Sequence, residues 1–100
     1  MTHSENIALE YAQQTAGLHY GQAVAALIIA KWPDGFSHEV GDAITIIVDN
    51  AVSTYTETLK VNGVKKRFRL SFETAYYIAV RNAFAEYASD CSARAMKAAA

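Results

Sequence analysis

The most concentrated chemical signal in the 100-residue sequence is a run of positive charge. Five of the nine basic residues fall in one ten-residue window that contains no acid: Lys60, Lys65, Lys66, Arg67 and Arg69. Lysine offers a compact ammonium, and arginine a planar fork that binds carboxylate or phosphate through two hydrogen bonds. Such a window attracts nucleic-acid phosphates or an acidic protein surface. It is equally typical of a solvated surface that deters aggregation.

The window hides within a chain that is almost neutral. Residues 1–59 hold seven acids and only Lys31 as a base, a balance of −6, while residues 70–100 hold three of each. With the window's +5 this gives the net charge of −1. The sequence therefore predicts a strongly dipolar molecule whose positive part is the candidate partner-binding site.

No other set of residues predicts chemistry. The three histidines, His3, His19 and His38, have no metal-ligand spacing, and no glycine-rich phosphate loop occurs. Cys91 falls on an apolar stripe beside Asp90, which is typical of a core residue rather than a nucleophile. We expect no catalytic residue, no metal site and no cofactor, and hence a protein that is not an enzyme.

The remaining features indicate where such a chain works. A single cysteine forms no internal disulfide, and the first residues lack the basic start of a signal peptide. The longest apolar run, Ala23–Ala30, is much shorter than the roughly 20 residues that span a bilayer. The expected location is the cytoplasm, with no membrane association.

Composition indicates one folded unit. Apolar residues make up 52% of the chain and charged residues 19%, which excludes an intrinsically disordered chain. One hundred residues suit a single domain over 1–100. We expect frayed ends over about 1–4 and 95–100.

The first predicted element is a helix over Ser4–Lys31, capped by Thr2 or Ser4 and closed by the turn residues Trp32–Gly35. Gly17 and Gly21, four residues apart, suit a tight helix crossing. Two apolar stripes lie on nearly opposite faces, so the helix is either sandwiched or shared with a second copy. One stripe is Ile7, Tyr11, Leu18, Ala25, Ile29 and Trp32, and the other includes Leu9, Ala16, Tyr20, Ala23 and Leu27. We predict a homo-oligomer, most simply a twofold dimer, through the second stripe or the opposite one.

The middle of the chain allows two interpretations. Ser37 to about Ser53 follows a helical period despite its β-branched residues. Asn62-Gly63 is typical of a type I′ turn and predicts a β-hairpin over about 54–70. Its inward face would carry Tyr55, Leu59, Val61, Val64, Phe68 and Leu70. The alternative continues the second helix to Lys60 and uses Gly63 as its C-cap.

Ser71 is then the expected N-cap of a last helix with one clean apolar stripe: Phe72, Tyr76, Ala79, Val80, Ala83, Phe84, Tyr87 and Cys91. The predicted fold is mainly α with a small β-hairpin, in the order α-α-ββ-α, and the alternative is an all-α three-helix bundle.

The expected function is that of a small non-enzymatic binding protein that contacts a macromolecule through the basic hairpin. We favour a protein-binding inhibitor or adaptor of the kind that phages and mobile elements encode, which would recognise an acidic protein surface. The alternative is a nucleic-acid-binding module that contacts phosphates.

Overall fold

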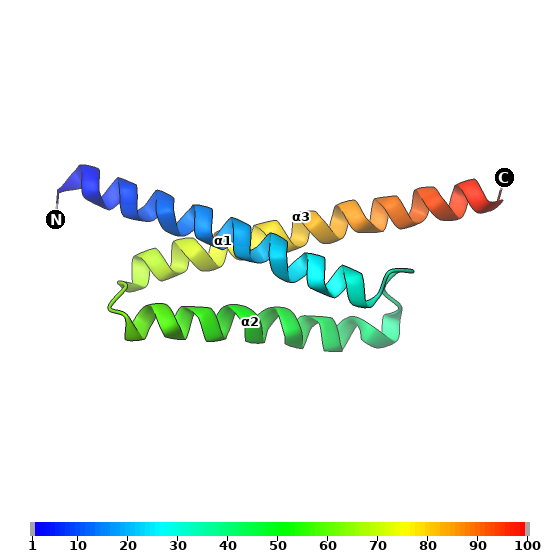
Figure 1. Ribbon diagram of the computed structural model, residues 1–100, viewed down its shortest axis with the longest axis horizontal. Coiled ribbons are helices and arrows are strands. Elements are labelled where there is room, and N and C mark those ends of the chain that lie inside the picture. The colour runs from blue at the N-terminus through cyan, green and yellow to red at the C-terminus, as the bar shows by residue number, and fades with distance from the viewer. Residues whose placement is uncertain (1, 100) are drawn as a thin grey trace.

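Three long helices make up the fold. The computed structural model describes residues 2–99, which contain α1 (His3–Lys31), a 3-10 turn η1 (His38–Val40), α2 (Gly41–Val61) and α3 (Lys66–Ala99) (Figure 1). No strand occurs in these residues. The molecule is an elongated rod with extents of 60 × 24 × 15 Å. The expected fraying falls partly on residues 1 and 100, which lie outside the described residues.

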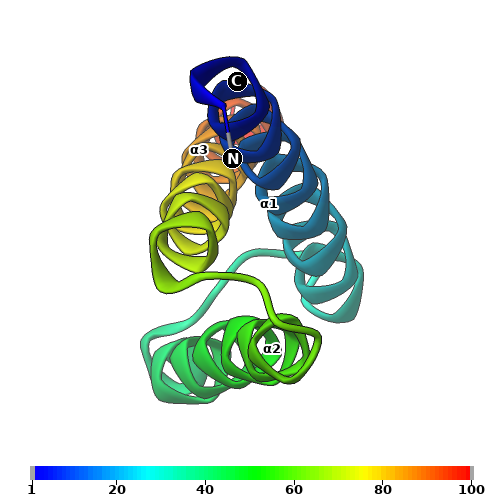
Figure 2. The ribbon, with the colours of Figure 1, turned by 90° about the vertical axis from the view of Figure 1, so that its left-hand side faces the viewer.

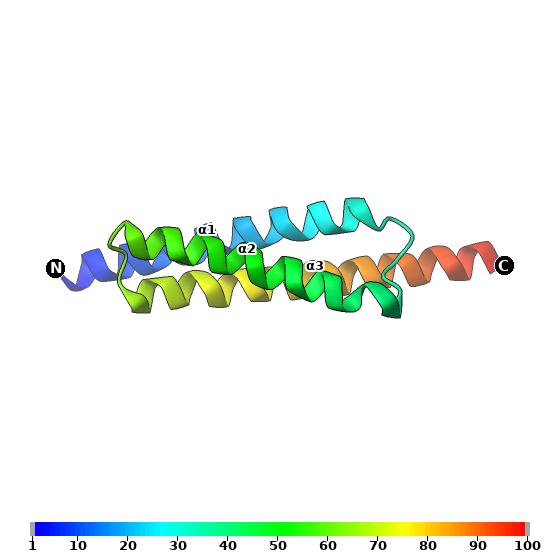
Figure 3. The same ribbon diagram turned by 90° about the horizontal axis from the view of Figure 1, so that it is seen from below.

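The helices run up, down and up, so α1 and α3 are parallel to each other and α2 runs against both (Figures 1 and 3). Seen along the rod, α1 and α3 form a pair, and α2 lies on one side of it (Figure 2). The start of α1 and the end of α3 extend beyond α2 at opposite ends of the rod (Figures 1 and 3). One side of the α1–α3 pair is therefore left without a covering helix.

The predicted β-hairpin is wrong, and the all-α alternative fits. Asn62-Gly63 ends α2: the Gly63 N–H donates to the Lys60 carbonyl at 3.0 Å, and the Val64 N–H donates to the Leu59 carbonyl at 2.9 Å. These two bonds form a Schellman cap, with Gly63 in the left-handed region at a φ of 83°. A type I′ turn needs positive φ at both central residues, whereas Asn62 has a φ of −81°.

The helical period over 44–59 overrides the β-propensity of these residues. Ile44, Val48 and Val52 are buried, and Tyr55 and Leu59 continue the same face against the core. Threonine hydroxyls on the outer side donate to carbonyls four residues back, which keeps them compatible with a helix (Thr45 to Gly41, Thr56 to Val52, Thr58 to Thr54). Burial of one continuous helical face therefore outweighs the β-propensity of the individual residues, and the segment is a helix.

The inward face predicted for the hairpin does not exist as a unit. Phe68 is buried, as predicted, but Val61 and Leu70 are 78% and 49% exposed. The prediction of Ser71 as an N-cap is also wrong, because α3 already begins at Lys66. The Ser71 hydroxyl donates to the Arg67 carbonyl inside the helix. The first helix agrees with its prediction: the Glu5 N–H donates to Oγ1 of Thr2, its N-cap, at 3.2 Å.

Two glycines set the crossing of α1 and α3. Gly17 and Gly21 are buried against the α3 backbone, so the tight crossing that their spacing suggested is present. A Cβ on Gly21 would lie 2.5 Å from the Tyr76 carbonyl oxygen, and one on Gly17 would overlap the Phe72 carbonyl oxygen. Only residues without a side chain allow this approach.

Aromatic side chains fill the space between this crossing and α2. Phe72 and Tyr76 are fully buried, and the Tyr76 hydroxyl donates to the Val48 carbonyl at 2.7 Å. Tyr55 stacks on Phe72 with ring centres 4.4 Å apart, and the Tyr20 hydroxyl donates to the Ala51 carbonyl at 3.2 Å. These hydroxyls bind carbonyl oxygens of α2, so they hold α2 in register as well as burying apolar surface.

A second group of aromatic side chains lies at the connection between α1 and α2. The Tyr87 hydroxyl donates to the Trp32 carbonyl and accepts from the Gly35 N–H at 2.7 Å. Phe36 packs on Tyr87 and, edge to face, on Phe84. Burial is the main reason why the pKa of Tyr87 lies above its ordinary value. The connection between α1 and α2 is thereby fixed to α3.

Replacing Gly21 by alanine tests the crossing. Alanine is the better helix former, yet here its Cβ pushes the two backbones apart, so we expect a loss of about 2 kcal/mol of unfolding free energy. Gly41→Ala is the matched control, because its Cβ would meet no described atom within 4 Å apart from its chain neighbours and its own helix backbone; it should be neutral or slightly stabilising. Urea unfolding of the two variants gives the answer, and equal stability would contradict a close-packed crossing.

The tyrosines predict how stability depends on alkaline pH. Burial, then the hydrogen bond to Asp49 Oδ1 at 2.7 Å, raises the pKa of Tyr77 from 10.0 to about 12. The folded state thus holds this proton more tightly than the unfolded state does. The resulting contribution of Tyr77 to the unfolding free energy is complete below pH 10 and is lost as pH rises towards 12. Tyr77→Phe should therefore flatten the fall of the unfolding free energy above pH 10 while leaving its pH dependence between 7 and 9 unchanged. Equal slopes for both proteins above pH 10 would refute this assignment.

Candidate functional site

All five predicted cations lie around the turn from α2 to α3, near the end of the rod at which α1 begins. Lys60 is in the last turn of α2, Lys65 precedes α3, and Lys66, Arg67 and Arg69 fall in its first turns. All are exposed except Arg69, which is half-buried. We call these five residues the basic tip. The structure thus keeps the predicted cluster together, on two helix ends instead of a hairpin face.

Arg69 has a structural task within the basic tip. Its Nη1 donates to the Val64 carbonyl at 2.6 Å, which ties α3 to the turn before it. It also lines a shallow cavity of about 230 Å³ together with Glu57 and Glu73, whose carboxylates offset part of its charge. A charge-assisted bond of this kind leaves Arg69 less free than the lysines to meet a partner.

Arg67 is placed over an aromatic ring. Its guanidinium carbon lies 5.1 Å from the centre of the Phe68 ring, and Phe68 itself is 4% exposed. The ring therefore faces inward, as its sequence position predicted, and Arg67 covers its outer face. The exposed charge of the basic tip is thus carried by Lys60, Lys65, Lys66 and Arg67.

Three consecutive cations stand where a helix favours acids. The Lys65 carbonyl accepts from the Phe68 and Arg69 N–H groups at 3.0 and 3.1 Å, so Lys65 takes the N-cap position of α3. The first turn of α3, residues 66–69, holds no acid, whereas those of α1 and α2 contain Glu5 and Asp42. Positive charge at a helix N-terminus opposes the helix dipole. The stability of the fold does not account for this placement.

The opposite end of the rod carries acids. Asp34, Glu39 and Asp42 lie in and around the connection between α1 and α2, near the right-hand side of Figure 1, whereas the basic tip is at its left. Lys31 and Arg94 lie at this end as well, and Glu10, Glu57 and Glu73 lie beside the basic tip. The basic tip is therefore a local positive cluster, and the dipolar pattern of the sequence is only partly kept along the rod.

The described residues hold no second chemical centre. Among residues 2–99, no group of three or more His, Cys, Asp or Glu side chains converges to hold a metal ion. Cys91 is half-buried on α3, and its Sγ accepts from Arg94 Nη2 at 3.2 Å.

The residues predicted for self-association separate into two groups. Ala16 and Tyr20 pack against the core, whereas Leu9, Ala23 and Leu27 remain on the surface. The stripe that the sequence suggested is therefore not one continuous exposed face.

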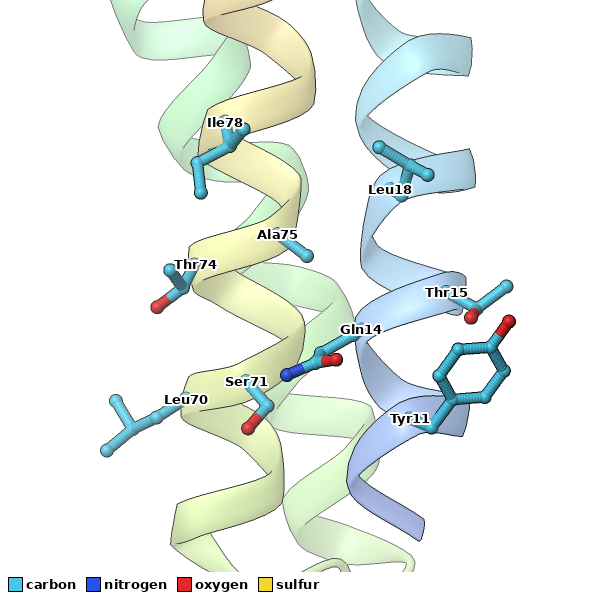
Figure 4. Close-up of a pocket in the computed structure, with 9 residues that line it drawn as sticks. All are labelled: Tyr11, Gln14, Thr15, Leu18, Leu70, Ser71, Thr74, Ala75 and Ile78. Carbon is cyan, nitrogen blue, oxygen red and sulfur yellow. The ribbon is translucent and has the colours of Figure 1, made fainter. Parts of the chain in front are cut away.

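An apolar groove forms elsewhere, between α1 and α3 on the side away from α2 (Figure 4). Part of the opposite stripe of α1, Tyr11 and Leu18, lines it together with Leu70 and Ile78 of α3. Its volume is about 590 Å³. Sequence periodicity detected the α1 half of this groove only, because the other half depends on which helix lies beside α1.

Comparison with protein-family models, with curated proteins and with solved structures finds no match for this chain. Within the described part of the chain, none of the helices combines the length and the apolar character needed to cross a membrane. Function must therefore be inferred from the basic tip and the groove themselves.

A substitution at Lys65 tests whether the basic tip costs stability. Lys65→Asp places a capping carboxylate and a negative charge at the start of α3, so we expect the unfolding free energy to rise by about 1 kcal/mol. Lys65→Ala, which removes the charge without adding an acceptor, should give a smaller gain. Thermal unfolding at low salt measures both, and a less stable Lys65→Asp protein would show that Lys65 already serves the helix.

Proposed function

We propose that the protein is a non-enzymatic binding module whose basic tip docks on an acidic surface of a protein partner, in the manner of an inhibitor or adaptor. The observation that carries this proposal is the run Lys65-Lys66-Arg67 at the start of α3. Three exposed cations there oppose the helix dipole, so binding a partner gives them the role that folding does not. The single cysteine favours the cytoplasm as the place of action.

The shape of the basic tip favours an acidic protein over a nucleic acid. The cations are confined to one end of a rod with a cross-section of 24 × 15 Å, rather than forming a stripe that could follow a phosphate backbone. Glu57 and Glu73 border the tip, so the positive surface is small and does not continue along the molecule as a bound nucleic-acid backbone would require. Its own aromatic ring, Phe68, is buried and unable to stack on a base. A short cluster of carboxylates matches these features.

Binding of defined anionic probes tests the proposal. The probes are a fluorescent 20-residue peptide rich in Asp and Glu, a DNA duplex and a DNA single strand, each titrated at 50 and 200 mM salt. We expect the peptide to bind, more weakly at the higher salt, and Lys65→Glu/Lys66→Glu to lower its affinity at least tenfold.

The matched control is Arg81→Glu/Lys97→Glu, which makes the same change in net charge on α3, away from the basic tip. This variant should bind the peptide within about twofold of the wild type if the site is local. An equal loss of peptide affinity in both double variants would show that only net charge matters, and would contradict a docking site at the basic tip. Stronger binding of either DNA probe than of the peptide would contradict an acidic protein partner and favour a nucleic acid as the partner of the basic tip.

A further inference from the structure

A small cavity adjoins the basic tip on the side of α1. Leu9 and Gln13, one turn apart on α1, line it together with Val64 and Lys65 of the turn from α2 to α3, and Asn62, Gly63 and Phe68 complete the lining. Its volume is about 200 Å³. Sites that hold small molecules measure roughly 300–1,000 Å³. The cavity is therefore of a size for one side chain of a partner rather than for a free ligand.

Apolar side chains form much of this lining. Leu9 is 40% exposed and Val64 is half-buried, so both keep apolar surface that a partner can cover, and Phe68 lies beside them. An apolar centre with a polar and charged rim is the usual anatomy of a protein interface. Side chains that fill such centres carry most of the binding free energy.

The charge beside the cavity selects an acidic partner. Of the seven described residues that line it, Lys65 alone carries a charge, and Lys66 and Arg67 follow it at the start of α3. Lys65 thus belongs both to the cavity and to the basic tip. Charge complementarity favours an inserted side chain that has carboxylates on either side of it in the partner's sequence.

The acids at this end of the rod do not line the cavity. Glu57 and Glu73 line the separate cavity beside Arg69, and Glu10 accepts a hydrogen bond from α3. Glu5 is exposed one turn before Leu9 on α1. An acidic segment therefore reaches the cavity from the side of the basic tip rather than along α1.

Gln13 adds an unpaired hydrogen-bond acceptor to this place. Its Oε1 is buried and has no hydrogen-bond partner among the described residues. Leaving a buried acceptor unpaired costs free energy, which a donor recovers. An extended segment inserted beside Gln13 brings backbone N–H groups that this side chain lacks.

Building on the proposed function, we propose that the acidic partner anchors itself at the basic tip by inserting one aliphatic side chain, such as leucine, into the cavity between α1 and the α2–α3 turn. The acids that flank this anchor pair with Lys65, Lys66 and Arg67. Charge brings the partner to the basic tip, and the apolar contact determines which acidic segment stays bound.

Two peptides separate the anchor from the charge. Both are fluorescent 13-residue peptides of Asp and Glu, one with a central leucine and the other with a central serine, and each is titrated at 50 and 200 mM salt. We expect the wild-type protein to bind the leucine peptide about tenfold more tightly. Both affinities should fall at the higher salt, while their ratio stays the same because salt screens the ionic contacts and not the apolar one.

A matched pair of variants locates the apolar contact. Leu9 and Leu18 are both 40% exposed on α1, but Leu9 lines the cavity and Leu18 lines the groove between α1 and α3. In Leu9→Ser the preference for leucine should fall to within about twofold, with binding of the serine peptide unchanged. Leu18→Ser should keep the full preference. Circular dichroism verifies that both variants remain helical.

The outcomes distinguish the anchor from the docking function on which it rests. Equal binding of the two peptides by the wild-type protein would overturn the anchor and leave the acidic docking site standing. Binding of neither peptide at 50 mM salt would overturn both. A preference for leucine that survives Leu9→Ser, or that Leu18→Ser abolishes instead, would place the apolar contact outside the cavity and overturn the proposal.

Discussion

The fold depends on the close approach of α1 and α3 at Gly17 and Gly21. Because the Cα atoms of these residues face the carbonyl oxygens of Phe72 and Tyr76, the two helices approach closely enough for Phe72 and Tyr76 to fill the space towards α2. The hydroxyls of Tyr76 and Tyr20 then reach carbonyls of α2 and fix its position. A wider crossing would leave these rings without a packed surface and α2 without its main support.

The same constraint produces the basic tip and the uncharged groove. α2 covers one side of the α1–α3 pair, and its return into α3 gathers the cations of the basic tip at one end (Figure 1). The other side of the pair stays open as an uncharged groove (Figure 4). The positively charged and the uncharged surface thus lie on different parts of the molecule.

Local signals predicted part of this structure correctly. The Thr2 cap, the end of α1 before Pro33 and the apolar stripe of α3 depend on neighbouring residues, and the structure confirms them. The β-hairpin prediction failed because Asn-Gly occurs both in hairpin turns and in Schellman caps. The outcome depends on whether Tyr55 and Leu59 pack against the core as part of a helix, which the dipeptide itself does not show. The true core face of α1 was missed because two of its five buried residues are glycines, which carry no hydrophobic signal. The groove was missed because it belongs to two helices at once.

The central functional claim is that the basic tip, and not the groove, meets the anionic partner. A ¹H–¹⁵N NMR titration of the wild-type protein with the acidic peptide at 50 mM salt tests it most directly, because the shifts report the place of contact residue by residue. The prediction is a set of perturbed amides confined to about residues 60–70, with the amides of Thr15, Leu18 and Ile78 unmoved. Perturbations centred on the groove, with the amides of Lys65, Lys66 and Arg67 unchanged, would contradict it.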